Sequence, residues 1–273
     1  MKITAHTAVY GIVGFPLGHT LSPVMHNTAF RETGLDGVYI PFETRDIAGA
    51  VRGMKALGIR GLSVTLPHKT DVMPLLDHID PRARAIGAVN TIVNRRGVLT
   101  GHNTDATGAL RALEAVIRIP GKQCLIVGAG GAARTIGVVL REKGAHVTIT
   151  NRSPGRGRDL ARAVGCAFVP MTGAGDVPAD LLIQATSVGM FPHVEDIPLS
   201  PEFLKPGMVV MDIIYNPVET RFLSLAREKG CTVIRGLGMF VHQGAEQFRL
   251  WTGMEPPVAE MARAAEAVLE KGG

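Results

Sequence analysis

LIVGAGGAARTIG, residues 125–137, follows a short hydrophobic run and leads into a segment with helical periodicity. Gly128, Gly130 and Ala133 in this stretch fit the pattern G-x-G-x-x-G/A. Glycine at 128 permits a tight turn, glycine at 130 lets the backbone approach a pyrophosphate, and alanine at 133 lets helix and strand pack closely. A purely structural turn is the alternative. We predict a dinucleotide site, because free amides at a helix start bind phosphate. The expected cradle is Gly128, Ala129, Gly130, Gly131 and Ala132.

The end of the next predicted strand indicates which dinucleotide binds. An NAD site usually has Asp or Glu there, about 20 residues after the glycines, to bind the ribose 2′-hydroxyl. In this chain the strand ends in VTITNRS, so Asn151 takes the place of the acid and Arg152 follows it. A guanidinium pairs with a 2′-phosphate, which a carboxylate would repel. We therefore expect NADP(H) rather than NAD. The expected contacts are Asn151, Arg152, Ser153 and Arg156.

Strand-like and helix-like segments alternate along the whole chain, as they do in α/β proteins. Ser22 is expected to cap a helix that ends at Gly34, and Arg96-Gly97 is expected to form a hairpin turn. The most economical division is two α/β lobes. One comprises residues 1–102, completed by the helices of 239–273, and the other is a Rossmann-type doubly wound domain of residues 103–238. Among the expected elements are strands at 9–14, 38–43 and 61–66 and helices at 22–34, 46–58 and 105–116.

The segment GLSVTLPHKTD (residues 61–71) ends a hydrophobic run on a lysine. Leu62, Val64 and Leu66 have the pattern of a strand, and Pro67 ends it. Lys69 then follows at the carboxyl edge, where ligands bind in open α/β sheets. A surface lysine in a loop is the alternative. The hydroxyls of Thr20 and Ser22, the amide of Asn90 and the carboxylate of Asp105 stand in other predicted loops and helix starts. Together these groups suit a polyhydroxylated acid.

Composition limits the other classes of function. The chain has 273 residues and a formal net charge of +5, but its basic residues form no long block. Charge therefore favours an acidic small ligand as readily as a nucleic acid. The three cysteines and nine histidines lack the spacing of disulfide frameworks or metal sites, so we expect no metal. His19, His68 and His102 are expected to make structural hydrogen bonds. With no leader pattern and no membrane-spanning run, a cytoplasmic protein is expected.

Several segments, in this order along nearly the whole chain, resemble the signatures of the shikimate dehydrogenase family. The resemblance implies reversible, NADPH-dependent reduction of 3-dehydroshikimate to shikimate, in the shikimate pathway of aromatic amino acid biosynthesis. It also implies that the N-terminal lobe binds the substrate. The segments are GFPLGHTLSPVMHN, GLSVTLPHK, GAVNT, HNTD, GAGGAAR, NRS, ATSVGM, DIIYNP and GMFVHQGAEQF.

The same resemblance assigns roles to single residues. Lys69 and Asp105 are similar to the family's catalytic pair. Thr186 and Gly238 match positions near the nicotinamide, and Tyr215 matches one near both substrate and nicotinamide. The expected substrate-binding residues are Thr20, Ser22, Thr65, Asn90, Tyr215 and Gln243.

Two residues depart from the family's pattern. Thr20 stands where many members have Ser, and its methyl group narrows the pocket. Ser63 stands where many members have Asn, and the shorter side chain leaves room or loses a hydrogen bond. A quinate/shikimate dehydrogenase of relaxed specificity is therefore one alternative, and a non-catalytic NADP-binding regulator is another. The expected partner is a small-molecule substrate, without nucleic acid or membrane, and both a monomer and a homodimer fit the sequence.

Overall fold

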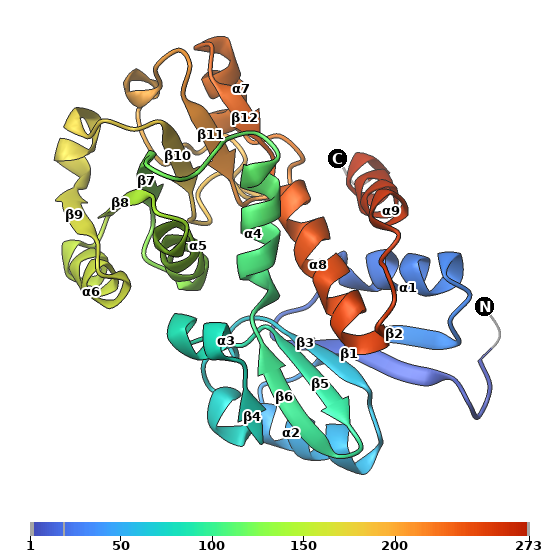
Figure 1. The fold of residues 1–273 in the computed structure, drawn as a ribbon. Coiled ribbons are helices and arrows are strands. Elements are labelled where there is room, and N and C mark those ends of the chain that lie inside the picture. The colour runs from blue at the N-terminus through green and yellow to red at the C-terminus, as the bar shows by residue number, and fades with distance from the viewer. Residues whose placement is uncertain (1–2, 19, 272–273) are drawn as a thin grey trace. The chain divides into compact units, whose positions relative to one another are not determined.

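The computed structural model describes residues 3–18 and 20–271, which divide into two compact α/β units (Figure 1). The first unit comprises Met1–Thr107 and Val241–Gly272, and the second comprises Gly108–Phe240. The divisions fall inside helices α4 (Thr104–Glu114) and α8 (Gly236–Thr252). The α/β fold with a Rossmann-type part is confirmed, whereas the limits at 102/103 and 238/239 stay predictions.

The first unit is built on a six-stranded mixed sheet with the order β2-β1-β3-β5-β6-β4. Strands β2, β1 and β3 are parallel, β5 is antiparallel to both β3 and β6, and β4 is parallel to β6. The strands are β1 (Ala8–Gly14), β2 (Gly37–Glu43), β3 (Gly61–Val64), β4 (His78–Ile79), β5 (Thr91–Arg95) and β6 (Val98–His102).

Alternate residues of β3 point to opposite faces of this sheet. Leu62 and Val64 pack into a core cluster with Val51 and other residues from α2 (Ile47–Ala56). On the other face, a Cβ at Gly61 would overlap the indole of Trp251 from α8. Helices α1 (Ser22–Glu32) and α9 (Val258–Lys271) lie side by side on that second face, opposite α2 (Figure 1).

Local turn chemistry accounts for several element ends. Asp46 caps α2 through its side chain, which accepts a hydrogen bond from the backbone N–H of Gly49 at 2.7 Å. Arg96 and Gly97 have φ values of 54° and 88°, and positive φ at both central residues is what a type I′ hairpin turn requires. The predicted hairpin is thus confirmed.

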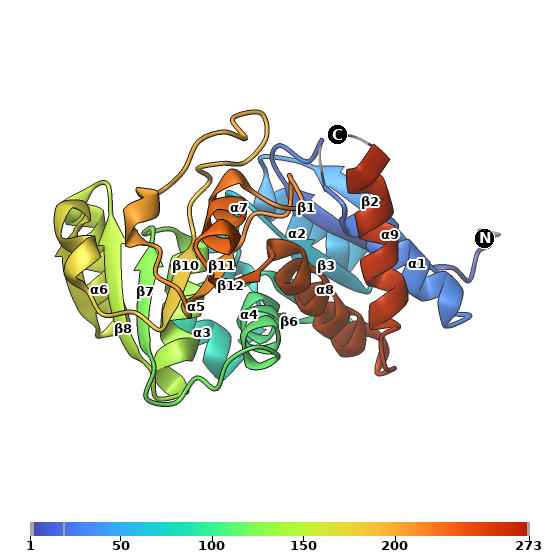
Figure 2. The ribbon, with the colours of Figure 1, turned by 90° about the horizontal axis from the view of Figure 1, so that it is seen from above.

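The second unit is built on a six-stranded, wholly parallel sheet with the order β12-β11-β10-β7-β8-β9. This is the doubly wound dinucleotide-binding order, and the crossover lies between β7 and β10. Figure 2 shows α5 and α7 on opposite sides of the sheet. The elements are β7 (Gln123–Val127), α5 (Gly131–Glu142), β8 (His146–Asn151), α6 (Pro154–Val164), β9 (Ala167–Pro170), β10 (Leu181–Gln184), β11 (Val209–Asp212), α7 (Arg221–Glu228) and β12 (Thr232–Ile234).

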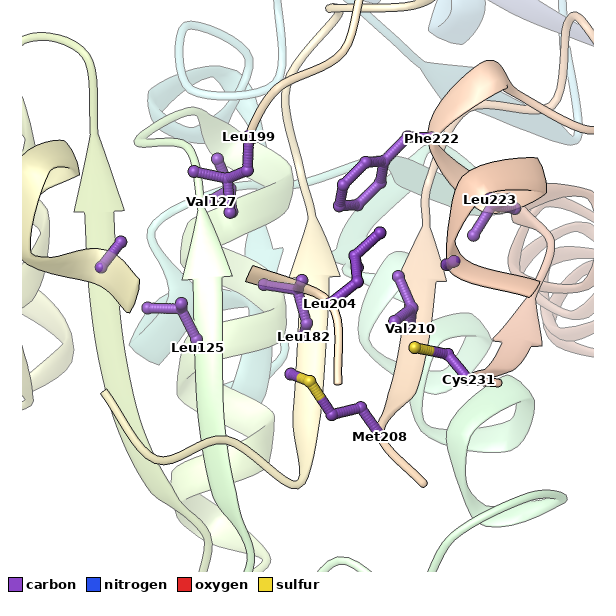
Figure 3. Close-up of a cluster of buried hydrophobic side chains, with 12 residues drawn as sticks. Leu125, Val127, Leu182, Leu199, Leu204, Met208, Val210, Phe222, Leu223 and Cys231 are labelled. Carbon is purple, nitrogen blue, oxygen red and sulfur yellow. The ribbon is translucent and has the colours of Figure 1, made fainter. Parts of the chain in front are cut away.

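A buried apolar cluster fills the space between this sheet and α7 (Figure 3). Leu125, Leu182 and Val210 come from three neighbouring strands, and Phe222 and Leu223 come from the helix. Each strand carries alternating hydrophobic residues to both faces, as expected for a sheet covered on both sides.

The structure corrects two expectations about the first unit. Ser22 is the first residue of α1 rather than its cap, because the capping position is Leu21, and no side chain makes a capping hydrogen bond at this helix start. Strand β3 ends at Val64, so Leu66 is not a strand residue and is 73% exposed. The elements not predicted are β4, β9, α3 (Pro81–Ile86) and the 3₁₀ turns η1 (Met73–Leu75), η2 (Met171–Asp176) and η3 (Pro201–Phe203).

Candidate active site

Lys69 lies in a turn that follows β3, and backbone hydrogen bonds hold this turn at both ends. Thr65 N–H donates to Val13 O at 3.0 Å, and His68 N–H donates to Thr65 O at 3.0 Å. The carbonyl of Lys69 itself accepts from Val89 N–H at 2.8 Å. The backbone of this turn is therefore held in place on both sides of Lys69.

The Lys69 ammonium forms an ion pair with Asp105, which lies in the first turn of α4. Nζ is 2.5 Å from Asp105 Oδ2, and the two side chains are 28% and 15% exposed. A partly buried pair of this kind is screened less by water than a surface pair. The structure thus brings together the two residues expected to be catalytic, although they are 36 positions apart.

Asn90 holds the second oxygen of the Asp105 carboxylate. Its Nδ2 group donates to Asp105 Oδ1 at 2.9 Å and lies 3.4 Å from Gln243 Oε1. On the other side of the amide, Oδ1 accepts from the Thr104 backbone N–H at 2.7 Å. Lys69, Asn90, Asp105 and Gln243 therefore form one cluster of polar side chains in the first unit.

Thr20 lies in the loop that leads into α1, and Ser22 is the first residue of that helix. The backbone N–H of Ser22 donates to Thr20 Oγ1 at 3.3 Å. Ser22 is buried near Tyr39. Burial raises the pKa of Tyr39 well above its ordinary value, while the Ser63 and Ser22 side chains act in the opposite direction. Thr65 is half-buried in the Lys69 turn. Within the described part of the chain, neither Thr20 nor Thr65 hydrogen-bonds the Lys69–Asp105 pair.

The histidines of these segments differ in their surroundings. His19 lies outside the described residues. His68 is buried, and its Nε2 lies 2.9 Å from Thr44 O, which is a structural bond of the expected kind. Burial lowers the pKa of His102, while the negative charges of Asp80 and Glu246 act in the opposite direction.

In the second unit, the glycine-rich turn has the shape that a pyrophosphate needs. Gly128 has a φ of 124°, and a Cβ there would lie 2.8 Å from Ala185 O. A Cβ at Gly130 or Gly131 would meet no atom within 4 Å, so the space above the turn is open. Helix α5 starts at Gly131 with no side-chain cap and no acidic residue in its first turn. Its first amides are free to bind an anion, with Ala129 and Ala132 beside them.

The residues expected to select the 2′-phosphate lie at the end of β8 and directly after it. Asn151 is half-buried, and its Nδ2 group donates to Ser153 O at 2.9 Å. Arg152 and Arg156 are exposed. In contrast, Arg158 lies over the Phe168 ring at 5.3 Å and Arg162 pairs with Asp159 at 3.3 Å, as expected for residues of a helix surface. The donor set fits a phosphate, because it has guanidinium groups and no carboxylate at position 151.

Thr186 and Tyr215 lie in two further loops at the carboxyl ends of parallel strands. Thr186 Oγ1 donates to Gln184 Oε1 at 2.9 Å. The Tyr215 ring packs on Phe240, with centroids 4.7 Å apart, and burial raises the pKa of its hydroxyl. Gly238 is half-buried in the first turn of α8 and near Ala112.

Sequence reasoning missed three buried polar residues that shape these loops. Gln184 accepts from the Thr186 backbone and donates to Val188 O, both at 2.9 Å. Asp212 and Gln247 are likewise almost wholly buried. A polar residue at the end of a hydrophobic strand was the available signal for Gln184 and Asp212, whereas Gln247 had none beyond its place in GAEQF.

Among the described residues, no three His, Cys, Asp or Glu side chains gather closely enough to hold a metal ion. The three cysteines are free thiols. In the same part of the chain, none of the helices has the length and apolar character needed to cross a membrane.

Family models match three stretches of the chain. Residues 12–92 match the shikimate dehydrogenase substrate binding domain, residues 110–191 match shikimate / quinate 5-dehydrogenase, and residues 236–266 match the shikimate 5′-dehydrogenase C-terminal domain. The matched stretches include Lys69, Gly128 and Gln243.

Whole proteins are similar over almost their full length. The shikimate dehydrogenase (NADP(+)) of Moorella thermoacetica is 46% identical, covering 96% of this chain and 94% of that protein. A shikimate dehydrogenase in complex with NADP+ has a TM-score of 0.95 at 40% identity, covering 98% of both chains. The enzyme of Thermus thermophilus, solved with NADP(H) and shikimate, has a TM-score of 0.90 at 40% identity, covering 96% of this chain and 100% of its own.

Proposed function

This chain belongs to the shikimate dehydrogenase family, and we propose that Lys69 and Asp105 are the acid–base pair with which it reduces 3-dehydroshikimate to shikimate, reversibly and with NADPH. The activity is that of an NADP-dependent oxidoreductase acting on a CH–OH group. The observation that carries the proposal for the pair is the 2.5 Å ion pair between Lys69 Nζ and Asp105 Oδ2.

Reduction of a ketone needs a hydride at carbon and a proton at oxygen. NADPH, when bound, supplies the hydride. The Lys69 ammonium stabilises the negative charge that develops on the carbonyl oxygen and donates the proton to it; in the oxidative direction the neutral amine takes the hydroxyl proton. Such acid–base assistance contributes about 10²–10⁴-fold in rate.

Asp105 and Asn90 hold the proton donor in place. The Asp105 carboxylate binds the ammonium through Oδ2, while Asn90 fixes Oδ1 from the opposite side at 2.9 Å. With both oxygens held, the carboxylate keeps one orientation, and the lysine keeps one position. This pre-organisation matters because catalysis depends on reacting groups that are already aligned.

The remaining site residues are proposed to bind the two ligands. For the substrate, hydroxyl and amide groups match a polyhydroxylated acid, and the residues are Thr20, Ser22, Thr65, Asn90, Tyr215 and Gln243. For NADP(H), the open turn before α5 and the arginines after β8 support the assignment. These residues are Gly128, Ala129, Gly130, Gly131, Ala132, Asn151, Arg152, Ser153, Arg156, Thr186 and Gly238.

The first experiment measures initial rates for shikimate and quinate, each with NADP and with NAD. Turnover of shikimate with NADP is expected to dominate. Lys69→Met should lower kcat about 10³-fold, from the usual range for general acid–base catalysis. Lys55→Met is the matched control, because Lys55 also pairs with an aspartate, Asp77, in the same unit at 2.9 Å. Near-normal turnover by Lys69→Met would refute the assigned role, and efficient quinate turnover would establish relaxed specificity.

A further inference from the structure

A second buried amide lies directly behind Asn90. Gln247, on α8, is 1% exposed. Its Nε2 group donates to Thr91 Oγ1 at 3.0 Å and lies 3.3 Å from the backbone carbonyl oxygen of Asn90. Its Oε1 lies 2.9 Å from Ser63 Oγ and 3.2 Å from His26 Nε2. Every polar atom of this side chain therefore has a partner.

The donor and acceptor of each bond follow from two backbone groups whose roles are certain, the carbonyl of Asn90 and the N–H of Thr104. A backbone carbonyl can only accept, so the Gln247 NH₂ group must face Asn90 O, and Oε1 must face Ser63 and His26. The Thr104 backbone N–H can only donate, so the Asn90 atom that it meets at 2.7 Å is Oδ1. Thr91 Oγ1 accepts from Gln247 and donates to the same Oδ1, 2.8 Å away. The Asn90 Oδ1 atom thus accepts from both Thr91 and the Thr104 backbone, and Asn90 Nδ2 faces Asp105 Oδ1 and Thr104 Oγ1.

The donors and acceptors on the Oε1 side of Gln247, among Ser63, Tyr39 and His26, can also be assigned. Ser63 donates to Gln247 Oε1, and the Tyr39 hydroxyl donates to Ser63 Oγ at 2.7 Å. His26 stacks on the Tyr39 ring at 4.5 Å and donates through Nε2. Burial lowers the pKa of His26 to about 3, so the ring is neutral. Its Nδ1 is buried with no hydrogen-bond partner among the described residues, which suits the Nε2–H tautomer.

We propose that Gln247 is a positioning residue for the acid–base pair: through Thr91 it adds a second hydrogen bond to Asn90 Oδ1, beside that of the Thr104 backbone N–H, and so holds the Asn90 amide with its NH₂ group toward Asp105. The inference rests on the proposed roles of Lys69 and Asp105 and deepens them. Within the described part of the chain Gln247 hydrogen-bonds neither of these two residues, so it acts through Asn90.

A compensating substitution at position 63 can test the positioning role of Gln247. Ser63 is paired with Thr91 across the antiparallel β3–β5 ladder, where facing side chains lie close together. An asparagine at 63 would bring an amide next to Thr91 from the strand side, in the space that Gln247→Ala vacates. The double variant Ser63→Asn with Gln247→Ala should therefore recover the ordering of Thr91.

The experiment compares Gln247→Ala with Asn94→Ala. Asn94 is also a buried amide on β5, but it binds the backbone of Ile59 and Gly97 at 2.9 and 2.8 Å. We expect both variants to lower Tm. Gln247→Ala alone should lower kcat about tenfold, the typical effect of one buried hydrogen bond, with KM for shikimate changed less than about threefold. The double variant should return kcat to within about threefold of the wild type.

A second readout needs no turnover. The side-chain amide ¹⁵N resonances of Asn90, assigned by their loss in Asn90→Ser, should shift and broaden in Gln247→Ala and not in Asn94→Ala. Unchanged Asn90 resonances in Gln247→Ala would overturn the inference, and so would a kcat loss that the double variant does not recover. An inactive wild type would refute the proposed function instead, and the resonances would then still decide the role of Gln247.

Discussion

The buried carboxyl group of Asp212 should make the free energy of unfolding of this protein depend on pH. The residue ends β11 in the second unit and is 0% exposed. Its Oδ1 accepts from the Ile214 N–H at 2.9 Å, and its Oδ2 accepts from Thr220 Oγ1 at 2.8 Å. The carboxyl group thereby bridges the two ends of the loop that carries Tyr215. Burial raises its pKa from 3.8 to about 7, although the two hydrogen bonds oppose that shift.

The sign of the effect follows from proton binding. Because the folded-state pKa lies above the unfolded value, the folded protein holds this proton more tightly than the unfolded chain does. The stabilising contribution is fully present below about pH 4 and is lost as the pH rises through about 7. The two pKa values differ by about three, and each pH unit corresponds to about 1.4 kcal/mol, so the full loss is about 4 kcal/mol.

The assay is urea unfolding of the wild type and Asp212→Asn at a series of pH values. The amide of the variant does not titrate but can still accept from Ile214. Between about pH 5 and about pH 8, the free energy of unfolding of the wild type should fall by about 3 kcal/mol relative to the variant. The contributions of all other titrating groups to the free energy of unfolding are the same in both proteins and cancel in this difference.

Asp180→Asn is the matched control. The Asp180 carboxylate accepts from Gln123 N–H, which lowers its pKa below the ordinary value. The stability that the Asp180 carboxylate contributes is lost only as the pH falls below the ordinary pKa of an aspartate. The difference in unfolding free energy between the wild type and Asp180→Asn should therefore stay constant above about pH 5. A flat profile for Asp212→Asn as well would refute the reasoning.

Three further substitutions have defined outcomes. Arg152→Ala should raise the KM for NADP about 10- to 100-fold by removing a charged hydrogen bond, and leave the KM for NAD nearly unchanged; equal effects in initial-rate assays would contradict the 2′-phosphate assignment. Gly128→Ala should weaken NADP binding in calorimetry, because φ is 124° and the new Cβ would lie 2.8 Å from Ala185 O; an unchanged Kd would argue against a tight turn. Gly61→Ala should cost about 1–3 kcal/mol in urea unfolding, since its Cβ would overlap the Trp251 indole; wild-type stability would show that the indole can move.

Much of the fold could be predicted because its signals are local. Gly34 and Gly58 have φ values of 69° and 66°, which explains why each glycine marked a helix end. The elements that escaped prediction are short. Strand β4 has two residues and β9 has four, too few for alternation to be recognised. The six residues of α3 carry a capping Asp80 but no full apolar stripe.

The hydrophobic pattern also misled at one point. Leu66 continues the alternation of Leu62 and Val64, yet it is 73% exposed after the strand has ended. The pattern could not reveal this, because alternation records which residues are apolar and not where the ladder of hydrogen bonds stops. The Lys69 turn therefore begins two residues earlier than expected.

The buried polar network of the first unit was beyond local reasoning for a different reason. Gln247 and Asn90 are 157 positions apart, and only the packing of α8 against the sheet brings them together. Asp105 is easier to predict, since a carboxylate at a helix start carries its own signal. Motifs thus mark the groups that meet ligands, whereas the groups that orient them become visible only in three dimensions.

This distinction bears on the selectivity between shikimate and quinate. The sequence led us to expect that both Thr20 and Ser63 influence this selectivity, but their surroundings differ. Ser63 is 5% exposed, accepts from Tyr39 and donates to Gln247, so its hydroxyl hydrogen is already committed within the protein. Thr20 is half-buried, and within the described part of the chain its side-chain oxygen accepts only a long bond from Ser22 N–H at 3.3 Å, which leaves its hydrogen available to a ligand. Of the two, Thr20 is therefore the residue at which a change of substrate choice should be sought: Thr20→Ser should alter the ratio of quinate to shikimate kcat/KM, and Ser63→Ala should alter kcat for both substrates alike.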